Sequence, residues 1–442
     1  MLLTHFSLKG ERPVNSIKIS KINANVYYDT LDNGLEVIVY KTPGFQKKMA
    51  FFQTRYGSLK NEFIPIGQTK MKSFPLGIAH FLEHKLFESK EKINYFEEFQ
   101  NKGAYLNAAT SYDKTYYYFV CSDNFYDNLT KLIDMVQTPY FTDENVEKEK
   151  GIIGQEIDMY SNNPNQTIYD KLYYNAFVKS PMKYDIAGTK KDIKKITKED
   201  LYECYNTFYH PSNMFLVVVG DLDENEVFET IKKNQSSKKF EKPFKIVCKK
   251  YEEPSKVAKK EEVISHNVSA TKFGYAYKMK IKELSDEKED YKRRFAIKTF
   301  LRIKFGCLSG FTEYLIKNNL VKSYFNYSHE IGKDFVLIIF SSDILDEKKV
   351  KSLIDEKLLE NIDMKKEFEL FKKAAISNYV KTFESPDSIC NHVRFMYNEY
   401  GKIIDDCYDI YSNITYDEFV NYIKGLDFNN QTKIMITKKE EV

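Results

Sequence analysis

The segment "GIAHFLEHKLFE", residues 77–88, places two histidines four positions apart, with a glutamate directly before the second histidine. Apolar residues such as Phe81 and Leu82 recur here at the spacing of an amphipathic helix, so we expect a helix. Because residues one turn apart project from the same helix face, the imidazoles of His80 and His84 can reach one cation. The segment therefore predicts two ligands of a single metal ion.

Glu83 lies one position before His84 and one turn from His80. From there its carboxylate can face a metal-bound water without binding the metal itself. The order H-x-x-E-H is the inverse of the commoner H-E-x-x-H and is a known arrangement of metallopeptidases. The alternative is that both histidines are ordinary core or surface residues, as a bare H-x-x-x-H would suggest. The glutamate and the apolar residues of the segment favour the metal site.

A hydrolytic zinc site typically has three protein ligands and a water, so two histidines leave it one ligand short. The segment "NVEKEKGIIGQEIDMYSNNP", residues 145–164, carries Glu149 and Glu156, which are seven residues apart and therefore share a helix face. Apolar residues flank Glu156, and a carboxylate is costly to bury there unless a cation or hydrogen bonds compensate. We predict Glu156 as the third ligand. Glu149 is a candidate to hydrogen-bond a ligating histidine, and a solvated acidic face explains it equally well.

At 442 residues the chain is longer than an ordinary single domain, which predicts two to four domains. Both halves show the same order of strands, a long helix, a strand pair, further helices and a closing strand. The expected strand pairs cover residues 104–122 and 323–343, and the closing strands cover residues 213–221 and 432–439. Short strands and long helices in blocks predict an α+β protein that arose by internal duplication.

The segment at residues 236–260 is rich in lysine and contains two prolines, which is typical of an exposed connector. We therefore expect an N-terminal metal-binding domain at residues 1–235, a linker at residues 236–260, and a homologous C-terminal domain at residues 261–442.

The charge balance argues against nucleic acid as a partner, since 67 Lys and Arg residues nearly match 64 Asp and Glu residues. The longest apolar runs, "FLVVV" and "FVLIIF", have the length of strands and are too short to cross a membrane. The stretch "MLLTHFSLKGERPV" has no apolar core of signal-peptide length, and the six cysteines form no C-x-x-C pair. We expect reduced thiols and a cytoplasmic protein without a membrane or nucleic-acid partner.

Four motifs, "GIAHFLEH", "LNAATSYDKTYYYF", "EKEKGIIGQEIDMYSNNP" and "CYNTFYHPSNMFLVVVGDLD", occur in this order. Together they resemble the pitrilysin/insulinase family of inverted-motif zinc peptidases, and most closely its bacterial YmfH-type subgroup. The resemblance spans nearly the whole chain. It implies two homologous α+β domains, each a mostly antiparallel sheet flanked by helices. It also implies one zinc ion held by His80, His84 and Glu156, with Glu83 as the catalytic base.

The resemblance further implies a zinc endopeptidase that hydrolyses peptides or unfolded segments, with Glu83 taking a proton from water. The stretch at residues 104–111 is similar to the family's substrate-binding edge strand, to which an extended peptide adds as a further strand. Asn107 and Ala108 are its candidate substrate-binding residues. For Asn107, a polar strand residue facing solvent is the alternative.

Members of the family complete the site with an arginine and a tyrosine from a second domain. The corresponding stretch here, residues 308–335, contains no arginine. Tyr324 and Tyr327 are candidates for the tyrosine, with an ordinary strand aromatic as the alternative for each. The resemblance therefore implies that the chain is the zinc-bearing member of a heterodimer whose homologous subunit supplies Arg and Tyr, or else a homodimer. A non-catalytic scaffold and a peptide-binding, modification-associated protein are the other functions of this fold, and the complete motif disfavours the scaffold.

Overall fold

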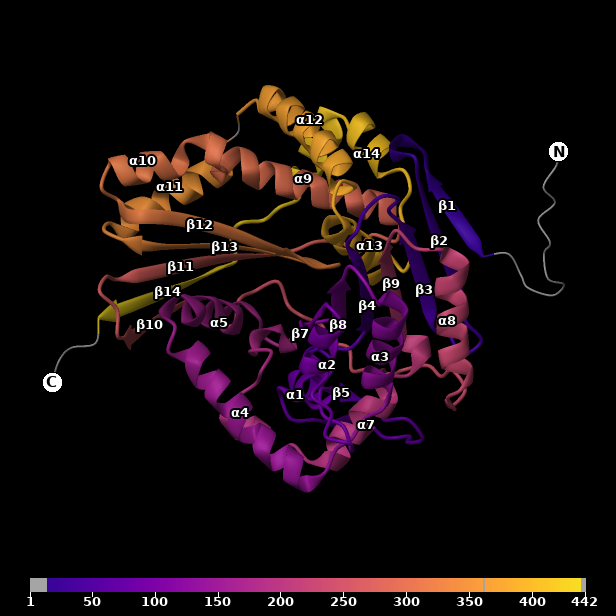
Figure 1. Ribbon diagram of the computed structural model, residues 1–442. Coiled ribbons are helices and arrows are strands. Elements are labelled where there is room, and N and C mark those ends of the chain that lie inside the picture. Colours follow the sequence, from indigo (N-terminus) through magenta and orange to yellow (C-terminus); the bar gives the residue numbers. More distant parts are fainter. Residues whose placement is uncertain (1–13, 361, 439–442) are drawn as a thin grey trace, which may run out of the picture.

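Two β-sheets form the framework of the protein in the computed structural model, which describes residues 14–360 and 362–438 (Figure 1). The first sheet has seven strands, in the spatial order β1 (Asn15–Ile19), β2 (Ala24–Thr30), β3 (Glu36–Lys41), β9 (Met214–Gly220), β4 (Lys48–Thr54), β8 (Thr115–Cys121) and β7 (Ala104–Thr110). The second has five, in the order β10 (Glu261–His266), β14 (Gln431–Lys438), β11 (Lys272–Lys280), β13 (Phe335–Ile344) and β12 (Val321–Ile331). All neighbouring strands are antiparallel except the parallel pairs β3–β9 and β10–β14.

Helices follow these strands in both halves of the chain. The helices of the first half are α1 (Ile78–Lys85), α2 (Tyr95–Asn101), α3 (Phe125–Gln137), α4 (Asp143–Ser161), α5 (Pro164–Ala176), α6 (Lys190–Ile193), α7 (Lys198–Phe208) and α8 (Glu224–Ser236). Those of the second half are α9 (Glu287–Phe305), α10 (Phe311–Lys317), α11 (Glu347–Leu359), α12 (Lys365–Thr382), α13 (Pro386–Tyr400), α14 (Cys407–Asn413) and α15 (Tyr416–Lys424). A short hairpin, β5 (Glu62–Phe63) and β6 (Lys72–Ser73), precedes α1. The predicted α+β class and the two strand pairs are confirmed.

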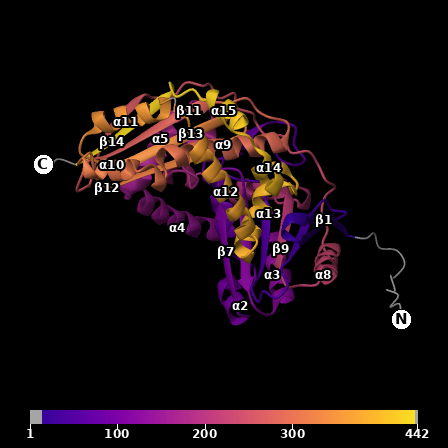
Figure 2. The ribbon, with the colours of Figure 1, turned by 90° about the horizontal axis from the view of Figure 1, so that it is seen from above.

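Each half of the chain contributes one helix that packs on the sheet of the other half, so each sheet is covered on one face by the other half. Ile389 and Val393 of α13 are buried against strands of the first sheet, including Val217 of β9. In return, α5 packs on the second sheet, where a Cβ atom added to Gly274 of β11 would lie only 2.5 Å from Ile168. Figure 2 shows α13 beside β9 and α5 beside β11. Helices α1, α3, α7 and α8 cover the remaining face of the first sheet.

Between α8 and β10 the chain contains no helix, and one residue of this segment is firmly anchored. The carboxylate of Glu253 accepts backbone hydrogen bonds from Val178 at 2.7 Å, Lys179 at 2.8 Å and Ser180 at 2.6 Å. It also pairs with the buried ammonium of Lys278 at 2.5 Å. The expected connector therefore has a fixed path. The proposed domain limits at residues 235 and 261 stay a prediction, since α5 and α13 each pack on the sheet of the other half.

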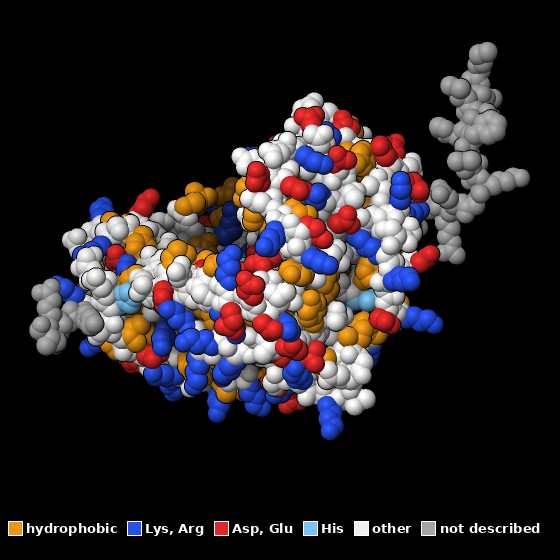
Figure 3. All heavy atoms as spheres, turned by 60° about the horizontal axis from the view of Figure 1, so that its bottom comes forward, with side chains coloured by type: hydrophobic (Ala, Val, Ile, Leu, Met, Phe, Trp, Pro, Cys, Tyr) orange, Lys and Arg blue, Asp and Glu red, His pale blue; other side chains and the backbone are white. Residues whose placement is uncertain are grey.

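Basic and acidic side chains intermingle on the face shown in Figure 3, in keeping with a net charge of +3. Within residues 14–360 and 362–438, no helix combines the length and the apolar character that crossing a membrane requires. All six cysteines are free thiols. The stretch "MLLTHFSLKGERPV", in which we expect no signal peptide, lies almost entirely outside the described residues.

Candidate metal centre

The start of α1 is fixed by two glycines that let separate backbone segments touch. Gly77, which caps the helix, has a φ of 85°, and Gly188 has a φ of 71°. A Cβ atom on Gly77 would lie 2.2 Å from the carbonyl oxygen of Ala187, and one on Gly188 would lie 2.6 Å from that of Leu76. Both positions require a residue without a side chain, because a positive φ and backbone contact each exclude one. The loop before α6 thus sets where α1 begins.

Helix α1 divides its residues between the core and the site. Ile78, Phe81 and Leu82 are buried in the main core of the first half, whereas His80 and His84 project toward α4. The rings of these two histidines lie 4.6 Å apart between centroids, as expected for residues one turn apart. Helix α4 begins at a capping box formed by Thr142 and Asn145, which fixes the start of the helix that carries the acidic residues.

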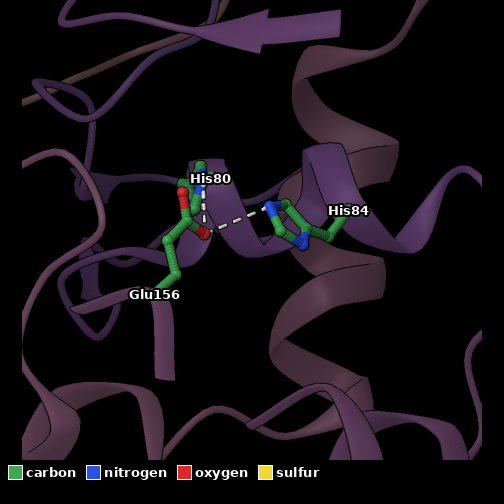
Figure 4. Close-up of side chains that lie close together, drawn as sticks. All are labelled: His80, His84 and Glu156. Atoms are coloured by element: carbon green, nitrogen blue, oxygen red, sulfur yellow. Dashed lines mark ion pairs between the residues drawn. The ribbon is translucent and has the colours of Figure 1, made fainter. Parts of the chain in front are cut away.

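The structure brings His80, His84 and Glu156 together (Figure 4). Oε2 of Glu156 lies 3.7 Å from Nε2 of His80 and 3.6 Å from Nε2 of His84, and the candidate ligand atoms all lie within 4.8 Å of one another. Three atoms bound tetrahedrally to one zinc at about 2.0–2.2 Å would be roughly 3.4 Å apart. The two distances from Glu156 are close to this value, so small side-chain shifts would let all three atoms hold one zinc ion, and the two nitrogens and one oxygen form the donor set of a catalytic site with one position left open.

Glu149 contacts the other side of the His84 ring. Its Oε1 lies 3.0 Å from Nδ1 of His84, so a proton on Nδ1 leaves the lone pair of Nε2 facing Glu156. Burial alone would lower the pKa of His84, but this bond and the nearby carboxylates raise that pKa. His80 differs, because burial and then the neighbouring His84 lower its pKa to about 3. His80 is therefore a neutral imidazole at physiological pH, which is the form that binds metals.

Lys85 supports Glu149, a role that the sequence alone does not predict. Its side chain is fully buried, with Nζ 2.8 Å from Oε1 of Glu88, 3.1 Å from the carbonyl oxygen of Asn145 and 3.9 Å from Oε2 of Glu149. An ammonium group that is fully shielded from solvent needs such acceptors, because burying an unpaired charge strongly destabilises the folded protein. The signal in the sequence is a lysine placed directly after His84, on a helix whose apolar residues are buried.

Glu83 projects from α1 toward the β7–β8 hairpin and is 9% exposed. The hydroxyl of Thr110, the last residue of β7, donates a hydrogen bond of 2.6 Å to its Oε2. Burial raises the pKa of the Glu83 carboxyl group, and the bond from Thr110 opposes that rise. The sequence alone does not predict this role of Thr110, because nothing in the order of residues places it beside Glu83.

The predicted substrate strand is an edge strand, since β7 pairs with β8 alone among the described strands. Ala108 lies on the same face of β7 as Thr110, whereas Asn107 alternates to the opposite face. There the Asn107 amide donates to the hydroxyl of Tyr105 at 2.9 Å, and its carbonyl oxygen accepts from the backbone of Ala108 at 2.8 Å. The Asn107 side chain thus points away from the Glu83 face, and its role toward substrate stays a prediction.

Tyr324 and Tyr327 lie on opposite faces of β12. The Tyr324 hydroxyl donates to Asp343 at 3.1 Å, and its ring lines a cavity of about 250 Å³ beside α5. Tyr327 packs near Phe305 of α9, with 6.2 Å between ring centroids. Neither tyrosine has a hydrogen bond to the residues of the metal centre in the part of the chain that the structure describes. The role of each tyrosine toward substrate therefore stays a prediction.

Two sequence models of protein families match the chain. The one described as "Insulinase (Peptidase family M16)" matches residues 63–190, and the one described as "Peptidase M16 inactive domain" matches residues 195–378. The first match contains the three residues that converge in Figure 4, whereas the second lies mostly in the second half.

Similarity to individual proteins extends over nearly the full length. The chain is 36% identical over 414 residues to the "Uncharacterized zinc protease YmfH" of Bacillus subtilis strain 168, covering 93% of this chain and 96% of the relative. The crystal structure of an M16-like peptidase from Alicyclobacillus acidocaldarius is 28% identical and matches with a TM-score of 0.86, covering 98% of this chain and all of that one. The chain is also 28% identical over 211 residues to the mitochondrial-processing peptidase subunit beta of Caenorhabditis elegans. This shorter match covers 46% of this chain and 43% of that protein.

Proposed function

Because this chain belongs to the insulinase family of peptidases, family M16, we propose that it is a zinc-dependent endopeptidase. The observation that carries this proposal is the convergence of His80, His84 and Glu156 from two helices, with the carboxylate of Glu83 on the same helix as both histidines. We assign these three residues as the zinc ligands and Glu83 as the general base. Zinc, when bound, would act as a Lewis acid and lower the pKa of a water molecule.

The residues of the chain then have separate tasks. Glu83 accepts the proton of the attacking water and returns it to the leaving amine of the peptide. Glu149 holds the Nδ1 proton of His84 and so keeps the Nε2 lone pair directed at the metal position. Edge strand β7 offers its free side to an extended peptide, which would add as a further strand beside Glu83.

We further propose that the active species is a heterodimer with a homologous subunit that supplies an arginine and a tyrosine. Two observations support this. The stretch at residues 308–335 contains no arginine, and one relative is by its name a subunit of a processing peptidase. Lysine cannot replace the planar, two-pronged donor of an arginine at a carbonyl or oxyanion. Peptidase assays on the isolated chain, the sibling and the mixture test the proposal, which full activity of the isolated chain would overturn.

Metal content and peptide hydrolysis of three variants test the catalytic assignment. We expect one zinc per chain in the wild type, loss of zinc in Glu156→Gln, and full zinc in Glu83→Gln with hydrolysis reduced by about 10²–10⁴-fold. Glu144→Gln is the matched control, because Glu144 is exposed in the first turn of the same helix. Unchanged zinc in Glu156→Gln would contradict the proposed centre.

A peptide-binding protein without turnover is the second candidate, favoured by the match of residues 195–378 to a domain described as inactive. The two candidates differ in one measurement. A binding protein would retain a fluorescent peptide without cleaving it, and Glu83→Gln would leave its affinity unchanged.

A further inference from the structure

Glu83 is held by one hydroxyl group from a strand far from α1 in the sequence. The bond from Oγ1 of Thr110 to Oε2 of Glu83 is 2.6 Å long and ends on a carboxylate that is 9% exposed. Hydrogen bonds to an ionised acceptor are short and stronger than those between neutral groups. No other side chain among the described residues hydrogen-bonds to this carboxylate, and the backbone N–H of Thr110 faces it as well, so its orientation depends on Thr110.

The direction of this bond follows from the next residue in the network. Oγ1 of Thr115 donates its single proton to the carbonyl oxygen of Tyr56 at 2.9 Å, and a carbonyl can only accept. Thr110 therefore receives no proton from Thr115, whose oxygen lies 3.2 Å away. The one proton of Thr110 goes to the closer, charged acceptor, Glu83. Thr110 is thus a fixed donor, and it occupies Oε2 while leaving Oε1 without a side-chain partner.

We propose that Thr110 is the positioning residue of the general base, holding Oε2 of Glu83 so that Oε1 takes the proton from water. The inference rests on the proposed function, in which Glu83 has that role. Thr110 is also the last residue of β7, the strand to which the peptide would add. One strand would therefore align both the scissile peptide and the base.

The kinetic test compares Thr110→Val, which keeps the shape and removes the donor, with Thr110→Ser, which keeps the donor. For Thr110→Val we expect kcat to fall about 10- to 100-fold, the effect of losing a hydrogen bond to a charged group, while KM and bound zinc stay unchanged. Thr110→Ser should retain most of the activity. Thr42→Val is the matched control, because Thr42 is 3% exposed and its hydroxyl has no partner among the described residues. Equal losses in Thr110→Val and Thr110→Ser, or no loss in either, would overturn the proposal.

A second readout uses the metal-free protein and does not depend on peptidase activity. We expect the shift in Tm caused by Thr110→Val to be at least halved in a Glu83→Gln background. A hydrogen bond from Thr110 to a neutral amide is weaker than one to a carboxylate, so its removal costs less stability. Additive shifts would show that the two residues are not coupled, which would overturn the positioning role. A wild-type protein with no activity alone or with its sibling would refute the proposed function, and the Tm cycle would still decide whether Thr110 holds Glu83.

Discussion

At the scale of single residues, the metal centre depends on a buried cation that binds no metal. Lys85 has no exposed surface, and its ammonium lies among Glu88, Glu149 and the backbone of Asn145. We predict that Lys85→Met lowers the free energy of unfolding of the metal-free protein by about 3–5 kcal/mol, because the nearly buried Glu149 loses its cation. Urea unfolding followed by circular dichroism measures this change.

The same substitution should weaken zinc binding by roughly 10- to 100-fold, the usual effect of disturbing a partner of a ligating histidine. Competition with a chromophoric chelator measures that affinity. Lys148→Met is the matched control, because Lys148 is exposed on α4 and forms no ion pair among the described residues. It should change stability by no more than about 0.5 kcal/mol. Wild-type zinc affinity in Lys85→Met would show that Glu149 holds His84 unaided.

The sequence predicts some residues of the metal centre and not others, and the difference has a physical reason. Helical spacing relates His80 to His84 and Glu149 to Glu156, because both pairs lie within one helix and share its period. Thr110 lies on a strand, and only the tertiary fold brings it to Glu83. The assignment of Glu156 over other acidic residues needed the cost of burying a carboxylate, while the roles of Tyr324 and Tyr327 stay predictions.

At the scale of elements, the position of α1 depends on its contact with the loop before α6. We predict that Gly188→Ala destabilises the protein and weakens zinc binding, because the new Cβ would lie 2.6 Å from the carbonyl oxygen of Leu76 at a φ of 71°. Backbone must move to relieve that contact, and α1 would move with it. We expect a loss of about 1–3 kcal/mol, typical of a strained backbone position, measured by thermal unfolding with and without zinc.

Gly151→Ala is the control, and its expected effect on stability has the opposite sign. Gly151 lies inside α4, and an added Cβ meets nothing within 4 Å, so alanine should stabilise the helix by about 0.4–1 kcal/mol. If Gly188→Ala were also neutral or stabilising, the close backbone contact would not determine where α1 begins.

Elements differ in how far the sequence predicts them. The strand pairs β7–β8 and β12–β13 follow from runs rich in aromatic and β-branched residues joined by short turns, and both form as expected. The sequence patterns define no individual element within residues 386–424, where the structure has α13, α14 and α15. Periodicity identifies an apolar helix face but not the sheet that it covers, so the packing of α13 on the first sheet was beyond prediction.

At the scale of the whole molecule, the exchange of α5 and α13 makes the two halves depend on each other. Without α13 the first sheet would expose buried residues such as Phe215 and Val217, and without α5 the second would expose Ile339. We predict that residues 1–260 and 261–442 each aggregate when expressed alone and form a soluble complex when expressed together. Size-exclusion chromatography and circular dichroism measure this outcome.

A nicked protein is the control for that experiment. A protease site inserted between Lys242 and Pro243, both exposed, should allow cleavage of the folded chain without separating the halves. A first half that is monomeric and unfolds cooperatively by itself would contradict the mutual dependence.

The path from α4 into α5 has a mechanical consequence. Of the three candidate ligands, His80 and His84 belong to α1, which packs in the core of the first half, and Glu156 belongs to α4. Only Asn162 and Asn163 separate the end of α4 from α5, and α5 packs on the sheet of the second half. Val146 and Ile153 anchor the earlier part of α4 in the core that also holds α1, so a change in the angle between the two halves would move chiefly the C-terminal turns of α4, which carry Glu156. The strength of metal binding would then depend on how the two halves are arranged.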